Sequence, residues 1–431
     1  MRTVSLKAGV IAAVLTFVSL ASIPDEPEIS SECFSQILTL VQQRDFFSAR
    51  RLLADNGEKL SRFHRLLVES FVCNAFNKPD MSNSKIDTLL DCFTQHLPDT
   101  LKMELHSLKL DNSVKLFDYR KAKIEADLII REYQNFLSKD DIDDYKNSLA
   151  IWSTVEQIPP QQVNIMEDVA IKMKKDKAGL NTIPVSSSGI SIDFIFDTGA
   201  NLSTISRSNA KKFSMELLPG HIDVLAGTGK KVDAQLACCK TMTIDNVQVR
   251  NALFLVFNDS DLAISGTDYS IQGIIGYPVI TALKEIQISR EGYLRIPKKT
   301  TSSEEKNLAF VQMTPIIEID GLYYNFDTGA NKTMLFKRYF DKYKADITKR
   351  NKEHKIQYAG IGGMGTYNGY YINFSPSIQG KEVILKKIAV ILQEFQFHWK
   401  YMYGNIGKDL INKFEKVTLN FDDMYVKFHS R

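Results

Sequence analysis

The sequence of 431 residues lacks the features of several common classes of protein. Its formal net charge is only +3 with 24% charged residues, so nothing indicates a nucleic-acid partner or an anionic membrane surface. It contains neither His-Glu-x-x-His nor Gly-x-Ser-x-Gly, which argues against a zincin and against a hydrolase with a nucleophile elbow. The seven histidines, among them His64, His221 and His398, are scattered without the spacing of ligands, so we expect no metal and no cofactor.

Cysteine is also scarce, with five residues in the whole chain. No spacing among them resembles a metal site or a dense disulfide framework. One or two disulfides can form among Cys33, Cys73 and Cys92. Cys238 and Cys239 are adjacent, and on a strand they would point to opposite faces, so we do not expect them to bond to each other.

Long apolar runs are missing apart from one near the start of the chain. Residues 8–20 form an apolar run of 13, preceded by Arg2 and Lys7 and followed by the small-x-small sequence Ser19-Leu20-Ala21. The run is too short for a membrane-spanning helix, and its pattern predicts an export signal over residues 1–21. An uncleaved membrane anchor is the alternative. Export would place the protein in a periplasm, on a cell surface or outside the cell.

What the chain does contain is one motif written twice. Residues 194–201 read Phe-Ile-Phe-Asp-Thr-Gly-Ala-Asn, and residues 324–331 read Tyr-Asn-Phe-Asp-Thr-Gly-Ala-Asn. Each copy is an apolar run typical of a buried strand, and it leads an aspartate into a turn whose glycine lets the backbone bend sharply. Asp327 follows Asp197 by 130 positions.

The repeat extends beyond these motifs. Gly-Ile-Ile-Gly at 273–276 corresponds to Gly-Asn-Ile-Gly at 404–407, 131 positions later, and Ala-Gly-Thr-Gly at 226–229 corresponds to Ala-Gly-Ile-Gly at 359–362, 133 positions later. Each half also closes with a pair of strand-like runs. A nearly constant offset over roughly 115 residues predicts one β-rich unit duplicated in tandem.

Two aspartates from equivalent turns can face each other across a two-fold-like axis. Side by side they cannot both ionise, so the pair holds one proton between them. The ionised member can accept a proton from a water molecule, while the neutral member donates one to the carbonyl under attack. This is general acid–base hydrolysis of an amide without a covalent intermediate.

On these paired motifs, residues 182–431 resemble the aspartic peptidases of the pepsin and retropepsin clan. The resemblance implies an all-β, bilobal acid-protease fold that acts as a monomer with an internal pseudo-dimer, and an endopeptidase with Asp197 and Asp327 as catalytic residues. Its substrate would be an extended peptide or an unfolded protein. In the family the threonine hydroxyls lock the two turns together. The residues implied to support the dyad are Thr198, Gly199, Ala200, Thr328, Gly329 and Ala330.

The sequence departs from the pepsin pattern in two ways. Ala200 and Ala330 stand where secreted pepsins have serine, as in retropepsins. One hydroxyl donor fewer near the dyad should raise its pKa values, so we expect activity less restricted to acid than that of a pepsin. Asn405 is polar where Ile274 is apolar, which weakens the second copy slightly.

Two glycine-rich stretches are expected to be hairpin tips. The resemblance implies that they are flaps closing over an extended peptide, formed by Gly227, Thr228 and Gly229 and by Gly360, Ile361, Gly362 and Gly363. The second stretch alone matches a dinucleotide fingerprint, but the sequence after it is strand-like rather than helical. Tyr358 and Tyr367 either line the cleft or are ordinary strand aromatics.

The first part of the chain has a different pattern. Residues 22–160 place apolar residues at helical spacing, and an acidic-aromatic-x-x-Ala sequence at 45–49 and 118–122 resembles the second-helix start of tetratricopeptide-type pairs. This helical domain either docks a protein partner or supports, shields or inhibits the catalytic half. The predicted organisation is completed by a linker or leading strand at 161–181, lobes at 182–297 and 308–431, and an inter-lobe linker at 298–307.

The rival function is a non-catalytic protein that binds peptides through helical repeats and inactive protease-like lobes. Retention of both aspartates and both threonines favours the peptidase.

Overall fold

A computed structural model describes residues 28–225, 231–264, 266–360, 363–394 and 397–430. The predicted export signal at 1–21 lies outside the described residues. The chain forms a helical unit that ends at Pro160 and a β-rich unit that begins at Gln161. The predicted fold class, a helical region followed by a β-rich domain, is confirmed. No helix of the described residues is long and apolar enough to cross a membrane.

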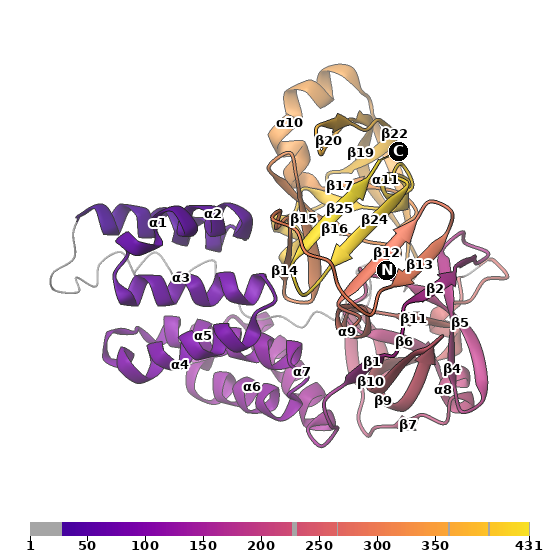
Figure 1. Ribbon diagram of the computed structural model, residues 1–431, viewed down its shortest axis with the longest axis horizontal. Helices are drawn as coiled ribbons and strands as arrows, with labels where there is room; N and C mark the ends of the chain where they lie inside the picture. The colour runs from indigo at the N-terminus through magenta and orange to yellow at the C-terminus, as the bar shows by residue number, and fades with distance from the viewer. Residues whose placement is uncertain (1–27, 226–230, 265, 361–362, 395–396, 431) are drawn as a thin grey trace. The chain divides into compact units, whose positions relative to one another are not determined.

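The helical unit consists of helices that run back and forth, each beside the next in sequence (Figure 1). A short 3-10 turn follows each of the helices α2, α4 and α6; these turns are η2 (Gly57–Lys59), η3 (Thr94–His96) and η4 (Gln134–Phe136). The helices are α1 (Glu28–Gln42), α2 (Phe46–Asn56), α3 (Arg62–Ala75), α4 (Pro79–Cys92), α5 (Asp99–Lys115), α6 (Tyr119–Tyr133) and α7 (Lys139–Val155).

One turn recurs in this unit after α1, α3 and α5. In each case a single residue takes a positive φ, 60° at Arg44, 54° at Asn77 and 58° at Phe117. The amide of the residue that follows it donates to a carbonyl five positions earlier, at 2.8–2.9 Å. This geometry reverses the chain between paired helices. The unit is therefore a tandem repeat of helical hairpins.

The acidic-aromatic-x-x-Ala sequence has a physical role at these turns. The carboxylates of Asp45 and Asp118 cap α2 and α6 by accepting the amide hydrogens of Ser48 and Lys121. The alanines at 49 and 122 are fully buried, so a small side chain allows close helix packing there. The tetratricopeptide resemblance itself stays a prediction.

The first copy of the duplicated β unit forms a sheet that closes on itself. Its order is β1-β10-β6-β11-β5-β4-β9-β7, and β9 also pairs with β10, which closes the ring from β10 to β9. The elements are β1 (Gln162–Ile165), β2 (Val169–Lys172), β3 (Lys174–Lys175), β4 (Asn181–Ser187), β5 (Ile190–Phe196), β6 (Ser203–Ser206), α8 (Arg207–Lys212), β7 (Glu216–Leu217), β8 (Ile222–Leu225), β9 (Lys231–Ile244), β10 (Val247–Phe257), η5 (Asp259–Leu262), β11 (Gly273–Ile275), α9 (Tyr277–Ala282), β12 (Glu285–Ser289) and β13 (Tyr293–Ile296).

The second copy repeats this order. Its sheet runs β14-β15-β16-β23-β17-β22-β19-β18, in which the order β15-β16-β23-β17-β22 corresponds to β4-β5-β11-β6-β10 of the first copy. The elements are β14 (Leu308–Val311), β15 (Thr314–Ile319), β16 (Leu322–Phe326), β17 (Met334–Leu335), α10 (Lys337–Arg350), β18 (Glu353–Gly360), β19 (Gly363–Phe374), β20 (Ser377–Ile378), β21 (Lys381–Glu382), β22 (Leu385–Ile391), η6 (Phe397–Tyr401), β23 (Gly404–Ile406), α11 (Lys408–Ile411), β24 (Lys416–Asn420) and β25 (Tyr425–His429).

A third sheet joins the two copies, in the order β2-β13-β12-β24-β25 (Figure 1). At its centre β12 of the first copy pairs antiparallel with β24 of the second, with Ile286 opposite Leu419 and Ile288 opposite Val417. All four side chains are buried. The strand pairs that close each half of the repeat therefore bind to each other and hold the halves in one unit.

Residues 161–181, interpreted from the sequence as a linker or leading strand, contain β1, β2 and β3. β1 pairs with β10, and β2 pairs with β13, placing Ile171 opposite Leu294. The segment is thus part of two sheets. Residues 298–307 contain no helix or strand. All five cysteines are free thiols.

Candidate active site

The two Asp-Thr-Gly-Ala turns follow equivalent strands and are held by equivalent neighbours. β5 runs parallel to β11, and the Asp197 amide donates to the carbonyl of Ile275 at 3.0 Å. In the second copy β16 runs parallel to β23, and the Asp327 amide donates to the carbonyl of Ile406, also at 3.0 Å. The two glycine-bearing stretches that the repeat predicted, 273–276 and 404–407, are thus the strands beside the aspartates.

The threonine hydroxyls connect the two turns in a reciprocal way. The Thr198 amide donates to Oγ1 of Thr328 at 3.0 Å, and the Thr328 amide donates to Oγ1 of Thr198 at 3.1 Å. Each hydroxyl then donates across to a carbonyl of the other copy, Thr198 to Phe326 at 2.6 Å and Thr328 to Phe196 at 2.8 Å. Four buried hydrogen bonds therefore fix the turns against each other.

This lock brings the two carboxyls together. A Cβ atom added at Gly199 would lie 2.7 Å from Cγ of Asp327, and one added at Gly329 would lie 2.3 Å from Cγ of Asp197. Each carboxyl therefore lies against the glycine of the opposite turn, in space that only a glycine leaves open. Each glycine amide also donates to Oδ1 of its own aspartate at 2.8 Å. Both aspartates are buried, with 0% and 2% of their surface exposed.

Burial raises the pKa of Asp197 to about 8, and the charge of Asp327 adds to this effect. The physical cause is that burial disfavours the charged form of a carboxyl and that two negative charges side by side repel each other. At neutral pH the pair therefore retains one proton.

One residue of the site was interpreted wrongly from the sequence. The Nδ2 amide of Asn405 donates to Oδ2 of Asp327 at 2.9 Å, and its Oδ1 accepts a hydrogen bond from Nδ2 of Asn325. Both asparagines are buried. Asn405 therefore does not weaken the second copy. It supplies a hydrogen-bond donor to the carboxyl of Asp327.

Most of the predicted flap residues cannot be placed. Gly227, Thr228, Gly229, Ile361 and Gly362 lie outside the described residues. Gly360, the last residue of β18, pairs antiparallel with Gly363, the first residue of β19, so these two glycines lie at one end of a hairpin. The turns at Ala200 and Ala330 match each other too, since these carbonyls accept the amides of Tyr277 and Lys408.

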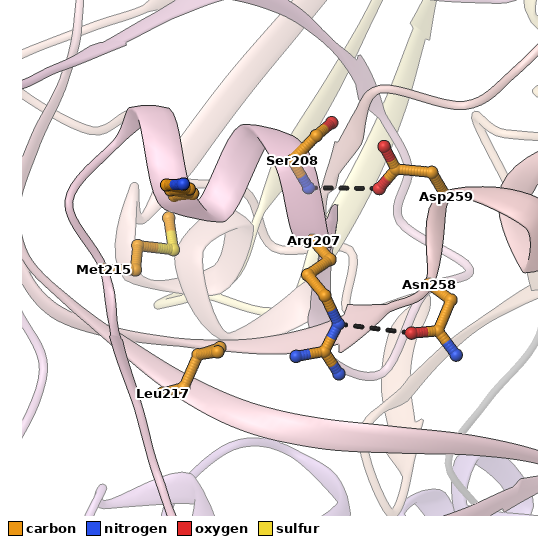
Figure 2. Close-up of a pocket in the computed structure, with 7 residues that line it drawn as sticks. Arg207, Ser208, Met215, Leu217, Asn258 and Asp259 are labelled. Atoms are coloured by element: carbon orange, nitrogen blue, oxygen red, sulfur yellow. Dashed lines mark hydrogen bonds between the residues drawn. The ribbon is translucent and has the colours of Figure 1, made fainter.

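A separate pocket lies on the first copy and is lined by residues of α8 and by neighbouring loops (Figure 2). Arg207 donates to Oδ1 of Asn258 at 3.2 Å, and the Ser208 amide donates to Oδ1 of Asp259 at 3.0 Å. These polar groups are satisfied by one another, and neither aspartate of the duplicated motif lines the pocket.

Comparisons with known proteins found one matching family model and several similar solved structures. Residues 183–279 match the family described as Aspartyl protease; this range contains Asp197 and Gly273–Gly276 but not Asp327. The solved structures that match include a retropepsin-like aspartic protease from Rickettsia conorii (19% identity, TM-score 0.23), with 30% of this chain and 97% of that chain covered. They also include Basic 7S globulin from soybean (11% identity, TM-score 0.38), with 62% and 95% covered. No curated protein matches.

Proposed function

We propose that this chain is an aspartic endopeptidase whose catalytic residues are Asp197 and Asp327. The observation that carries the proposal is the reciprocal packing of the two carboxyls, each against the turn glycine of the other copy. Two buried carboxyls that share one proton are the arrangement that activates a water molecule for attack on an amide. The match of residues 183–279 to the aspartyl protease family supports the same reaction.

In the proposed reaction a water molecule lies between the carboxyls and the peptide carbonyl. The ionised carboxylate takes a proton from the water molecule while the water oxygen bonds to the carbonyl carbon. The neutral carboxyl gives its proton to the carbonyl oxygen, which leaves a tetrahedral diol. The newly protonated carboxyl then gives its proton to the amide nitrogen as the C–N bond breaks, and the other carboxylate takes a proton from the diol as the new C=O bond forms, so the dyad again holds one proton.

The remaining features of this proposal come from the sequence. We propose that residues 1–21 direct export, that the two copies are the lobes of a bilobal protease, and that the flaps named above cover an extended peptide. We propose also that the helical hairpins bind a protein partner or the substrate itself. Digestion of a peptide library with and without residues 22–160 would separate a docking role from an inhibitory one.

Substitution of either aspartate tests the proposal. Asp197→Asn and Asp327→Asn remove one ionisable group while keeping the shape of the side chain. Each should lower the rate of cleavage of a denatured protein substrate by at least about 10³-fold, because acid–base catalysis alone contributes up to about 10⁴. Binding of an uncleaved peptide, measured by fluorescence anisotropy, should change little.

The matched control is Asp193→Asn, because Asp193 lies on the same strand β5 but pairs with Lys174 at the surface. It should retain full turnover. Peptide binding by the wild-type chain without any cleavage between pH 3 and pH 8 would instead support the non-catalytic rival.

A further inference from the structure

We propose that Asn405, oriented by Asn325, makes the dyad asymmetric, so that Asp327 is the ionised carboxylate and Asp197 carries the shared proton. This inference rests on the proposed peptidase function and adds the assignment of the two chemical roles. It makes Asn405 and Asn325 positioning residues.

The asymmetry appears when the two copies are compared position by position. On β5 and β11 the paired residues next to the active site are Ile195 and Ile274. At the same place on β16 and β23 the pair is Asn325 and Asn405. Both members of a contacting apolar pair have thus been replaced by amides in one copy only. Neither isoleucine side chain carries a hydrogen-bond donor.

The orientation of the Asn405 amide follows from its two neighbours. Oδ2 of an ionised Asp327 can only accept a hydrogen bond, so Nδ2 of Asn405 must face it. Oδ1 of Asn405 then faces Asn325, which donates from its own Nδ2. Reversing either amide would bring two acceptors or two donors together in a buried site, which costs far more than it gains.

The two carboxyls are therefore solvated differently. Asp327 accepts from the Gly329 amide at Oδ1 and from Asn405 at Oδ2. Asp197 accepts from the Gly199 amide at Oδ1, but among the described residues no N–H group donates to its buried Oδ2. Hydrogen bonds to the charged form favour ionisation, and burial without a donor opposes it. We therefore place the shared proton on Oδ2 of Asp197, where the protonated carboxyl can donate a hydrogen bond to the ionised Asp327.

The charged groups near the dyad either favour the ionised form of Asp327 or affect both aspartates equally. The repulsion between the two carboxylates is mutual, so it does not decide which of them is ionised. Lys408, the first residue of α11, donates to the carbonyl of Gly179 at 2.6 Å and interacts electrostatically with Asp327, Lys175 and Asp176. When charged it favours the ionised form of Asp327.

The assignment gives each carboxyl one task in the reaction. Asp327 takes the proton of the attacking water while the new O–C bond forms. Asp197 transfers its proton to the carbonyl oxygen as the C=O π bond becomes a C–O–H single bond. After these two transfers Asp327 is protonated and Asp197 is ionised. Asp327 then protonates the leaving nitrogen as the C–N bond breaks, and Asp197 takes a proton from a diol hydroxyl as the new C=O bond forms, which restores the starting state.

Replacement of the asparagine pair by the isoleucines of the other copy tests the assignment. The double variant Asn325→Ile/Asn405→Ile leaves no orphaned amide and gives both aspartates the same apolar neighbours. Loss of a hydrogen bond to a charged group should move the acid limb of the kcat/KM pH profile upward by about 1–2 pH units. The matched control is the reverse pair, Ile195→Asn/Ile274→Asn, which adds a donor at Asp197 and should move the acid limb downward.

A merely structural role for the asparagines would lower kcat/KM equally at every pH and leave the limb in place, which would overturn the assignment. A direct measurement on the wild-type chain does not depend on turnover or on the folding of a variant. Titration of selectively labelled aspartate carboxyl carbons by NMR should show Asp327 ionising at lower pH than Asp197. The opposite order overturns the inference, whereas clear titration without any peptide cleavage contradicts only the peptidase function.

Discussion

The threonine lock makes a quantitative prediction about stability. Thr198→Val removes the hydroxyl and keeps the shape of the side chain. The buried amide of Thr328 then loses its acceptor, and the carbonyl of Phe326 loses a donor. Each buried polar group left without its partner costs about 1–3 kcal/mol, so the variant should lose about 2–6 kcal/mol. Because a typical domain is stable by only about 5–15 kcal/mol, this loss is a large fraction of the total.

Urea unfolding followed at Trp399 measures this loss, because Trp399 is buried in the β unit whereas Trp152 belongs to the helical unit. Thr198→Ser keeps both hydrogen bonds and removes one methyl group, which should cost about 1 kcal/mol. Thr328→Val breaks the mirror-image pair of bonds and should match Thr198→Val. A Thr198→Val protein as stable as wild type, or a serine variant as unstable as the valine variant, would show that the reciprocal bonds do not hold the turns together.

Two further predictions concern buried ionisable groups. Burial raises the pKa of Glu104 from 4.5 to about 8; the stability that its proton contributes is fully present below pH 4.5 and is lost as the pH rises through about 8. Between these two pH values the unfolding free energy of the wild type, measured in urea, should fall by about 1.4 kcal/mol per pH unit because of Glu104, and Glu104→Gln should lack this fall. Unfolding free energies of variant and wild type that change with pH in parallel would contradict the raised pKa. Lys408→Met removes the donor that holds the carbonyl of Gly179, so hydrogen exchange of the amides at 178–180 should accelerate. Lys413→Met is the surface control. Unchanged hydrogen exchange at 178–180 in Lys408→Met would show that this hydrogen bond does not stabilise the segment.

The duplicated unit was predictable because the signal occurs twice. Any single Asp-Thr-Gly turn is ambiguous, but a matched pair at an offset of 130 also requires matched neighbours, and the structure places 273–276 and 404–407 beside the two aspartates. The helical pattern of the first unit was equally strong. In both cases local periodicity and repetition agree, which is when sequence reasoning succeeds.

The strands within 161–181 were harder to recognise because their partners are far away in the sequence. β2 pairs with residues more than 120 positions later, and four lysines within 172–177 obscure the pattern. A local signal was present all the same. Val169 and Ile171 are buried while Ala170 and Lys172 are exposed, the alternation of a strand with one face against a core.

Asn405 was misjudged because each position was compared with its counterpart alone. An isolated polar residue at an apolar position indicates a weaker copy of a motif. The informative fact is that two positions change together, Ile195 to Asn325 and Ile274 to Asn405, and that parallel pairing brings each pair into contact. A paired change of this kind points to a hydrogen-bonded unit rather than to decay, because a lone buried amide would be costly.

Fusion of both copies into one chain is what makes such a difference available. Two identical halves related by exact symmetry would offer the same donors to both carboxyls, and neither would be favoured as the acid before a substrate binds. Here the reciprocal bonds of Thr198 and Thr328 keep the symmetry that brings the carboxyls together, with the same two kinds of hydrogen bond in each direction. The asparagine pair breaks the symmetry on β16 and β23, where it favours the proton on Asp197 without moving the turns. Geometry and proton placement are therefore set by different residues, and variants of one set should leave the other property intact.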